Sequence, residues 1–160
     1  MPKITIQSIL TGEYLKLGSK IGPDLWVVNM MPKIDPIRSY WELTSDLNEF
    51  PQPISISTNP GINDEYATLG ILNGQISFDG ILVNQCIAHG ENFGDNMVFN
   101  FVKFDPNKQF YFIEYTEGRK LIVFDPREGD DAYHQIYLEN TEIGNDLEIK
   151  GEKFFITEHF

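Results

Sequence analysis

Cys86 and His89 are the one thiol and imidazole placed closely enough in the sequence to suggest nucleophilic catalysis, in which a base activates the thiol. On a strand, residues three apart point to opposite faces of the sheet. The two side chains therefore cannot meet unless the chain bends between them. We expect a half-buried cysteine and a loop histidine, because free cysteine usually packs as a small hydrophobe.

Other residue patterns that perform chemistry do not occur in the sequence. The nucleophile elbow, the phosphate-binding loop, the zinc-protease helix and the dinucleotide glycine fingerprint are all missing. His134 and His159 lie far apart and do not have the spacing of zinc ligands. The acidic run 125–131 offers carboxylates to calcium, but its spacing is not that of an EF-hand, and Asp, Pro and Gly favour turns. We therefore predict no catalytic residue, no metal site and no cofactor, and so no enzyme.

The charge balance narrows the class of partner. Lys and Arg number 12 against 24 Asp and Glu, which gives a formal net charge of −12. So acidic a chain is repelled by phosphate backbones and by anionic lipid surfaces. No apolar stretch approaches the roughly 18 residues that a transmembrane helix needs. We expect no nucleic-acid partner and no membrane insertion.

The length and the cysteine content indicate one domain without disulfide bonds. A chain of 160 residues, 41% of them hydrophobic, can bury a sizeable core, and we assign residues 1–160 to a single domain. The single cysteine excludes an internal bridge. The segment from Met1 to Gln7 lacks the long apolar core of a signal peptide. We expect a cytoplasmic protein, or one released without a signal peptide.

The local pattern predicts short strands rather than helices. Gly, Pro, Asn and Asp interrupt the chain at intervals of roughly eight to twelve residues, and no long segment keeps a 3.6-residue period. Blocks such as 25–28, 110–113 and 121–124 are aromatic or β-branched. Gly118 lies in a hairpin connection between the last two blocks. The sequence therefore predicts an all-β domain.

Three segments of the sequence, approximately 4–46, 53–104 and 109–158, repeat the same order of elements. Roughly fifty residues separate one unit from the next, and each unit has four predicted strands. The predicted strands are 4–6, 14–17, 25–29 and 40–43 in the first unit, 54–56, 66–69, 81–84 and 98–101 in the second, and 110–112, 120–123, 135–138 and 153–156 in the third.

This order resembles the β-trefoil superfamily, whose members build a six-stranded barrel capped by three hairpins from three four-stranded units. The resemblance covers the chain from about Ile4 to Thr157. It implies pseudo-threefold symmetry, with Trp41, Phe99 and Phe154 at equivalent core positions. Three such units can bury apolar faces and edges that one unit cannot bury alone. The alternative is a different barrel, such as a lipocalin-like one, in which these rings are scattered core aromatics.

Two groups within the superfamily are similar to this chain in part. Ricin-B-like lectins carry Gln-x-Trp in the closing strand, where this chain matches only at Trp41. Lys16, Thr68 and Ile122 stand near the position of the acidic residue that grips sugar hydroxyls in those lectins. Cysteine-poor trefoil protease inhibitors, which are acidic and made without a leader, are similar in composition only.

We predict a non-enzymatic recognition module that binds carbohydrate through the loops between its strands. The third unit offers a carboxylate, an aromatic ring, an imidazole and an amide for a pocket between its second and third strands, namely Asp125, Tyr133, His134 and Asn140. Trp26 is a further candidate because its ring points to the opposite side from Leu25 and Val27.

A protease inhibitor of the trefoil type is the second hypothesis. Two loops containing proline, Met31–Pro36 and Asn59–Asp64, would carry it, because proline reduces a loop's freedom before docking. A protein-interaction or toxin-complex subunit is a further alternative. The partner is thus a glycan or a protein, and the sequence predicts no oligomeric state.

Overall fold

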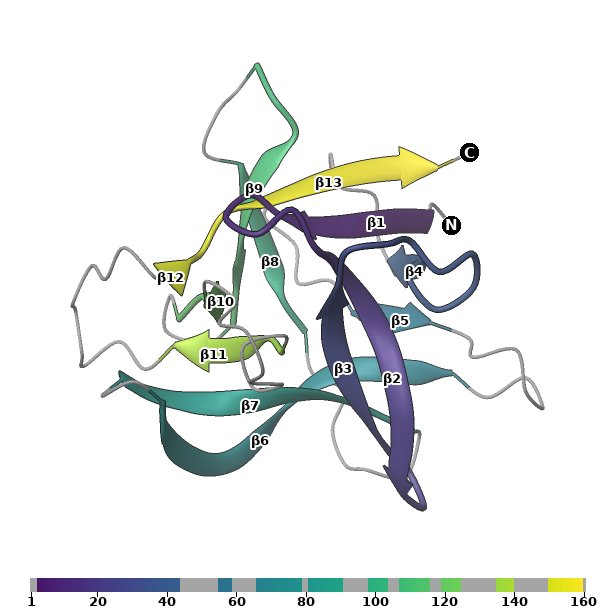
Figure 1. Ribbon diagram of the computed structural model, residues 1–160, viewed down its shortest axis with the longest axis vertical. Helices are drawn as coiled ribbons and strands as arrows, with labels where there is room; N and C mark the ends of the chain where they lie inside the picture. Colours follow the sequence, from purple (N-terminus) through teal and green to yellow (C-terminus); the bar gives the residue numbers. More distant parts are fainter. Residues whose placement is uncertain are drawn as a thin grey trace.

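Antiparallel strands make up nearly all the regular structure of the chain (Figure 1). The computed structural model describes residues 3–43, 55–58, 66–78, 81–90, 98–103, 107–115, 119–124, 135–139 and 150–159. Within these ranges no helix is long and apolar enough to cross a membrane. The strands are β1 (Lys3–Ser8), β2 (Tyr14–Gly22), β3 (Leu25–Met31), β4 (Trp41–Leu43), β5 (Ile56–Thr58), β6 (Ala67–Phe78), β7 (Ile81–His89), β8 (Asn100–Lys103), β9 (Phe110–Glu114), β10 (Leu121–Phe124), β11 (Tyr137–Glu139), β12 (Lys150–Gly151) and β13 (Phe154–His159). The all-β class predicted from the sequence is confirmed.

Seven of the described strands close an antiparallel barrel in which each strand pairs with the next. The order around the barrel is β1, β2, β3, β7, β6, β5 and β4, which returns to β1. Closure leaves fewer strand edges exposed than an open sheet would have. The remaining described strands extend from this barrel.

The two ends of the chain are joined in the sheet. β1 pairs with β13 through six residue pairs, from Lys3 opposite His159 to Ser8 opposite Phe154. Figure 1 shows these strands side by side, with both termini at the same end of the pair. β13 pairs in turn with β9, and β9 with β8. β1 therefore links the closed barrel to the last third of the sequence.

Three hairpins carry most of the remaining pairing. They are formed by β2 with β3, β6 with β7, and β10 with β11. β7 joins all three, because it also pairs with β3 and with β11. β7 extends to His89 rather than ending at residue 84 as predicted, and its residues from Cys86 to His89 are all buried.

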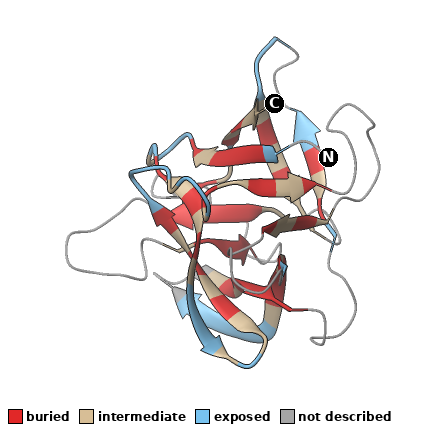
Figure 2. Cartoon of the chain, turned by 90° about the vertical axis from the view of Figure 1, so that its right-hand side faces the viewer, coloured by how far each residue is buried: buried red, intermediate tan, exposed pale blue. Residues whose placement is uncertain are grey.

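The core follows from the alternation of side chains along the strands. In β3 the residues Trp26, Val28 and Met30 are buried, whereas their neighbours are partly exposed. Buried residues follow the strands, and exposed ones gather at turns and hairpin tips (Figure 2). Trp41, Phe99 and Phe154 are each fully buried, so the prediction that these rings belong to the core is confirmed. Trp41 also donates a hydrogen bond from Nε1 to the carbonyl of Leu15, at 3.1 Å.

Replacing Phe154 by alanine should lower the free energy of unfolding by about 3 to 5 kcal/mol, because the fully buried ring leaves a cavity. Phe155 provides the matched control, since it is the next residue of β13 and its side chain is only half-buried. Urea denaturation of Phe154→Ala and Phe155→Ala measures both losses. Equal losses for the two variants would contradict the assignment of Phe154 to the core.

Candidate functional site

Most of the residues proposed from the sequence for a binding pocket fall outside the described structure. Asp125, Tyr133, His134 and Asn140 lie outside the described residues, and so does the loop 59–64. The pocket in the third unit therefore stays a prediction. Trp26 and the loop from Met31 to Pro36 are described, and both belong to the first unit.

Trp26 lies on the buried side of β3. Its side chain is 4% exposed and belongs to the hydrophobic core. The ammonium group of Lys20 lies 4.9 Å from the centre of the indole ring, so a cation covers part of the ring that the core does not. The alternation predicted around Trp26 is present, but it directs the ring inward. The ring of Trp26 is therefore not displayed to solvent, where a sugar could stack on it.

The outer face of the β2–β3 hairpin brings together several side chains of different chemistry. Tyr14 pairs with Met31 and Lys16 pairs with Asn29, so these four side chains lie on one face while Leu15 and Met30 point into the core. Tyr14 and Asn29 are half-buried, and Met31 is 37% exposed. A Cβ atom on Gly18 would lie 2.9 Å from the backbone carbonyl oxygen of Val27 and 2.6 Å from Nδ2 of Asn29, so the hairpin leaves little room for a larger residue at this position. We call Tyr14, Lys16, Asn29 and Met31 the hairpin face.

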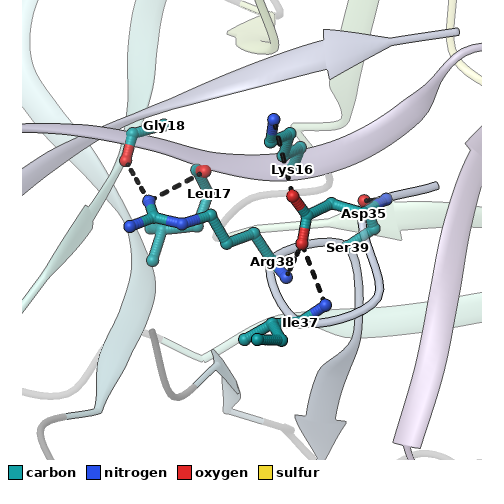
Figure 3. Close-up of polar contacts among 7 residues, drawn as sticks. All are labelled: Lys16, Leu17, Gly18, Asp35, Ile37, Arg38 and Ser39. Carbon is teal, nitrogen blue, oxygen red and sulfur yellow. Dashed lines mark hydrogen bonds and ion pairs between the residues drawn. The ribbon is translucent and has the colours of Figure 1, made fainter. Parts of the chain in front are cut away.

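Asp35 fixes the loop that borders the hairpin face (Figure 3). Its Oδ1 accepts hydrogen bonds from the backbone N–H groups of Ile37 and Arg38, at 2.9 and 2.8 Å. The backbone N–H of Asp35 donates to Oγ of Ser39 at 2.8 Å. Oδ2 lies 3.8 Å from Nζ of Lys16, which belongs to the hairpin face. One carboxylate therefore holds the turn and also contacts the hairpin.

Arg38 fastens the same loop to the edge of β2 (Figure 3). Its Nη1 donates to the carbonyl of Gly18 at 2.9 Å. Its own carbonyl accepts a hydrogen bond from the N–H of Leu17 at 2.9 Å. The turn consequently cannot move away from β2 without breaking contacts of both backbone and side chain.

The electrostatic environment keeps Asp35 ionised. Hydrogen bonds from the backbone N–H groups of Arg38 and Ile37, with a smaller effect of the positive charges on Lys16 and Arg38, lower the pKa of the Asp35 carboxyl. The side chains of Lys16 and Asp35 are 29% and 30% exposed, so a ligand can reach both groups. Each carboxylate oxygen can accept two hydrogen bonds, and Oδ2 retains capacity for a ligand hydroxyl.

The loop from Met31 to Ile37 displays apolar side chains on this fixed frame. Ile34 is 40% exposed and Ile37 is 56% exposed, and both prolines of the loop, Pro32 and Pro36, are exposed. The sequence predicted this loop as a docking segment from its prolines. The loop is exposed, the docking role stays a prediction, and the hydrogen-bonded frame of the loop is not visible in the sequence.

Cys86 and His89 both lie in β7, and each side chain is 1% exposed. The prediction of a half-buried cysteine and a loop histidine is therefore wrong in detail, because β7 is paired on both edges as far as His89. His89 Nδ1 forms a hydrogen bond with the carbonyl oxygen of Gly90 at 2.9 Å. Burial raises the pKa of the Cys86 thiol far above its ordinary value. Among the described residues no three His, Cys, Asp or Glu side chains are grouped to hold a metal ion.

A partly buried polar network, which the sequence does not predict, joins the second and third hairpins. Arg119 donates from Nη2 to Oδ1 of Asn84 at 2.7 Å and from Nε to the carbonyl of Glu139 at 2.9 Å. Asn84 Nδ2 donates to the carbonyl of Leu72 at 2.8 Å, beside the irregularity in β6. These groups satisfy one another and hold β11 against β7, so we assign them a structural role.

The fold of this chain is similar to that of two solved structures. One is a salivary protein from Culex quiquefasciatus that belongs to the Cysteine and Tryptophan-Rich (CWRC) family, with a TM-score of 0.63 and 16% sequence identity over 98% of this chain and 92% of the other. The second is SeviL bound to asialo-GM1 saccharide, with a TM-score of 0.55 and 12% identity over 100% of this chain and 99% of the other. No protein family model and no curated protein matches the sequence. At such identities the likeness concerns the fold alone.

Replacing Asp35 by alanine should destabilise the protein by about 0.5 to 2 kcal/mol at neutral pH, because two backbone N–H groups lose their acceptor. The pKa of Asp35 is lower in the folded state, so this stabilisation is present at neutral pH and is lost as the pH falls through the folded-state pKa. Urea denaturation of Asp35→Ala and of the parent protein at several pH values should show a difference that shrinks in acid. Lys33→Ala, in the same exposed loop, is the control. A difference that grows as the pH falls would contradict this role.

Alkylation of Cys86 by iodoacetamide should be slow in the native protein and fast after denaturation. The thiol is buried and its pKa is raised, so little thiolate is present or accessible at neutral pH. Mass spectrometry of the alkylated fraction against time measures both rates. Rapid native-state labelling accompanied by loss of a binding or catalytic activity would instead point to a reactive cysteine.

Proposed function

We propose that this chain is a non-enzymatic module of the β-trefoil type that binds glycans through the hairpin face and the neighbouring carboxylate of Asp35. The observation that carries the proposal is the group of partly exposed side chains with different hydrogen-bonding properties on one hydrogen-bonded frame. Lys16 donates, Asp35 accepts, and the amide of Asn29 does both. Tyr14 adds an aromatic ring on the same face.

These groups match the chemistry of a sugar. A pyranose presents hydroxyls that donate and accept at its edge, and C–H groups on its face that pack against an aromatic ring. The carboxylate of Asp35 is already oriented by two backbone N–H groups, so little conformational entropy is lost when a hydroxyl binds. A pre-formed acceptor of this kind favours affinity for a weakly held, hydrated ligand.

The trefoil type is supported by how the strands pair. In an up-and-down barrel such as a lipocalin each strand has two neighbours, next to it in sequence. Here β1 pairs with β2, β4 and β13, and β7 pairs with β3, β6 and β11. The three hairpins, β2 with β3, β6 with β7 and β10 with β11, join strands that the sequence predicts as the second and third of each unit, which supports the proposal. Similarity over the whole chain to SeviL, a structure bound to a saccharide, adds support to a carbohydrate ligand.

Binding of a protein, with protease inhibition as its specific form, is the second candidate function. It is favoured by the exposed apolar side chains of Met31, Ile34 and Ile37 on the loop that Asp35 and Arg38 hold in place. A loop that is ordered before docking loses less entropy when it enters a protease cleft. The two functions use the same loop but different side chains, so substitutions can separate them.

A glycan array probed with the full chain, read beside inhibition assays on papain-like and trypsin-like proteases, tests the proposal. We expect glycan binding that weakens by about tenfold or more in Asn29→Ala, which removes the amide, and in Asp35→Asn, which replaces the outward carboxylate oxygen, an acceptor, by an NH2 donor. Ile34→Asp should leave glycan binding unchanged but abolish any protease inhibition.

Asp125→Ala and Lys33→Ala are the control variants for the array. Loss of glycan binding in Asp125→Ala but not in Asn29→Ala would move the site to the third unit. If the chain binds no glycan on the array but inhibits a protease, and Ile34→Asp removes that inhibition, the second candidate function is favoured. Circular dichroism of each variant confirms that the strand signal is retained.

A further inference from the structure

Asn73 and Gly74 are the one Asn-Gly pair of the sequence, and they lie in the middle of β6. The register between β6 and β7 shifts between Ile71 and Gln75, so neither residue of the pair has an opposite residue in β7. A bulge of this kind interrupts the ladder and bends the strand, and β6 curves strongly in Figure 1. Both residues are exposed. The pair therefore lies outside regular pairing and is accessible to water.

Neither backbone conformation nor packing requires glycine at residue 74. Among the described glycines, Gly12 is the one with a positive φ. A Cβ atom on Gly74 would meet nothing within 4 Å. Glycine in the interior of a strand weakens the strand. Its chemical effect here is that no side chain shields the backbone nitrogen of Gly74 from the neighbouring carboxamide of Asn73.

We propose that Asn73 is a site of spontaneous covalent modification, in which its carboxamide becomes a carboxylate. The backbone nitrogen of Gly74 loses its proton and forms a bond to Cγ of Asn73, and the bond from Cγ to the amide nitrogen breaks. The departing nitrogen takes up the proton that Gly74 lost and leaves as ammonia, so a five-membered cyclic imide remains. Water then adds to one of the two ring carbonyls and opens the ring. No oxidant or reductant takes part.

The two ways of opening the ring give different backbones. Opening at Cγ gives aspartate. Opening at the former backbone carbonyl gives isoaspartate, in which that carbonyl becomes a free carboxylate and the chain continues through Cγ. In the unmodified protein Nδ2 of Asn84 donates to this carbonyl of Asn73 at 3.2 Å.

Isoaspartate therefore places a negative charge where Asn84 already donates a hydrogen bond. The Oδ1 atom of Asn84 accepts from Nη2 of Arg119 at 2.7 Å, so the new carboxylate joins the network that links the second and third hairpins. None of these residues belongs to the hairpin face. The proposal is consequently independent of glycan binding.

Incubation of the native full chain at neutral and at mildly alkaline pH, followed by peptide mass spectrometry, tests the proposal. Conversion of Asn73 raises the mass of its peptide by about 1 Da. The rate should rise with pH, because the attacking nitrogen must be deprotonated. Asn107 is the internal control, since it is also exposed but is followed by Lys108. We expect Asn73 to convert at least about tenfold faster than Asn107, because the side chain of Lys108 shields the attacking nitrogen there.

Gly74→Ala is the matched variant, because the added Cβ has space around it and lies beside the attacking nitrogen. It should keep the strand signal in circular dichroism and slow the conversion of Asn73 by about tenfold or more. Labelling of the incubated parent protein by an isoaspartyl methyltransferase should locate isoaspartate at residue 73.

Equal rates in Gly74→Ala and in the parent protein would overturn the proposal. So would conversion of Asn73 no faster than that of Asn107, a comparison that needs no variant and decides the question if Gly74→Ala does not fold. Conversion seen only after the chain is unfolded in urea would also overturn it, because the fold would then hold the nitrogen of Gly74 away from Cγ.

Discussion

The pairing of β1 on both of its edges is the constraint on which the rest of the structure depends. β13 occupies one edge through six residue pairs, and on the other edge β4 pairs with Lys3 and Ile4 while β2 pairs with Gln7. Ile4 and Ile6 of β1 are fully buried, so the same strand supplies backbone pairing and core packing. The hairpin face lies on β2 and β3, and the loop beside it leads into β4. Because β1 pairs with both β2 and β4, it sets the position of the loop relative to the hairpin face.

The geometry of the candidate site depends on how β1 positions β2 and β4 and on the carboxylate of Asp35. The candidate site begins on β2 and ends where the loop enters β4. The loop between β3 and β4 folds back onto β2 through hydrogen bonds of Arg38. Asp35 then organises the turn and points its second oxygen toward Lys16. Backbone hydrogen bonding, rather than the weak and partly exposed ion pair, is the larger contribution to this order. The result is a fixed polar surface beside exposed apolar side chains.

The sequence predicts the class of the fold well because the underlying signals are local. Alternation in segments such as 25–31 and the buried aromatic residue near the start of each closing strand give strands and core directly. It predicts the site less well. Alternation shows that Trp26 faces away from its neighbours, but which face is buried depends on the strands that pack there.

Long-range pairing explains the other differences from the sequence-based expectations. His89 lies in a strand because β3 and β6 both pair with the end of β7, and neither contact is visible near His89 in the sequence. The sequence alone does not group Tyr14 with Asn29, although the same alternation places them on one face once their hairpin register is known. Asp35 lies in the loop whose prolines mark it in the sequence, and its hydrogen bonds emerge only from the folded turn.

The most direct test of the glycan site is an NMR titration of the full chain with a panel of soluble mono- and oligosaccharides. We predict that the largest amide shifts occur at Asn29, Ile37 and Arg38. Shifts confined to β10 and β11, or none with any sugar, would contradict it.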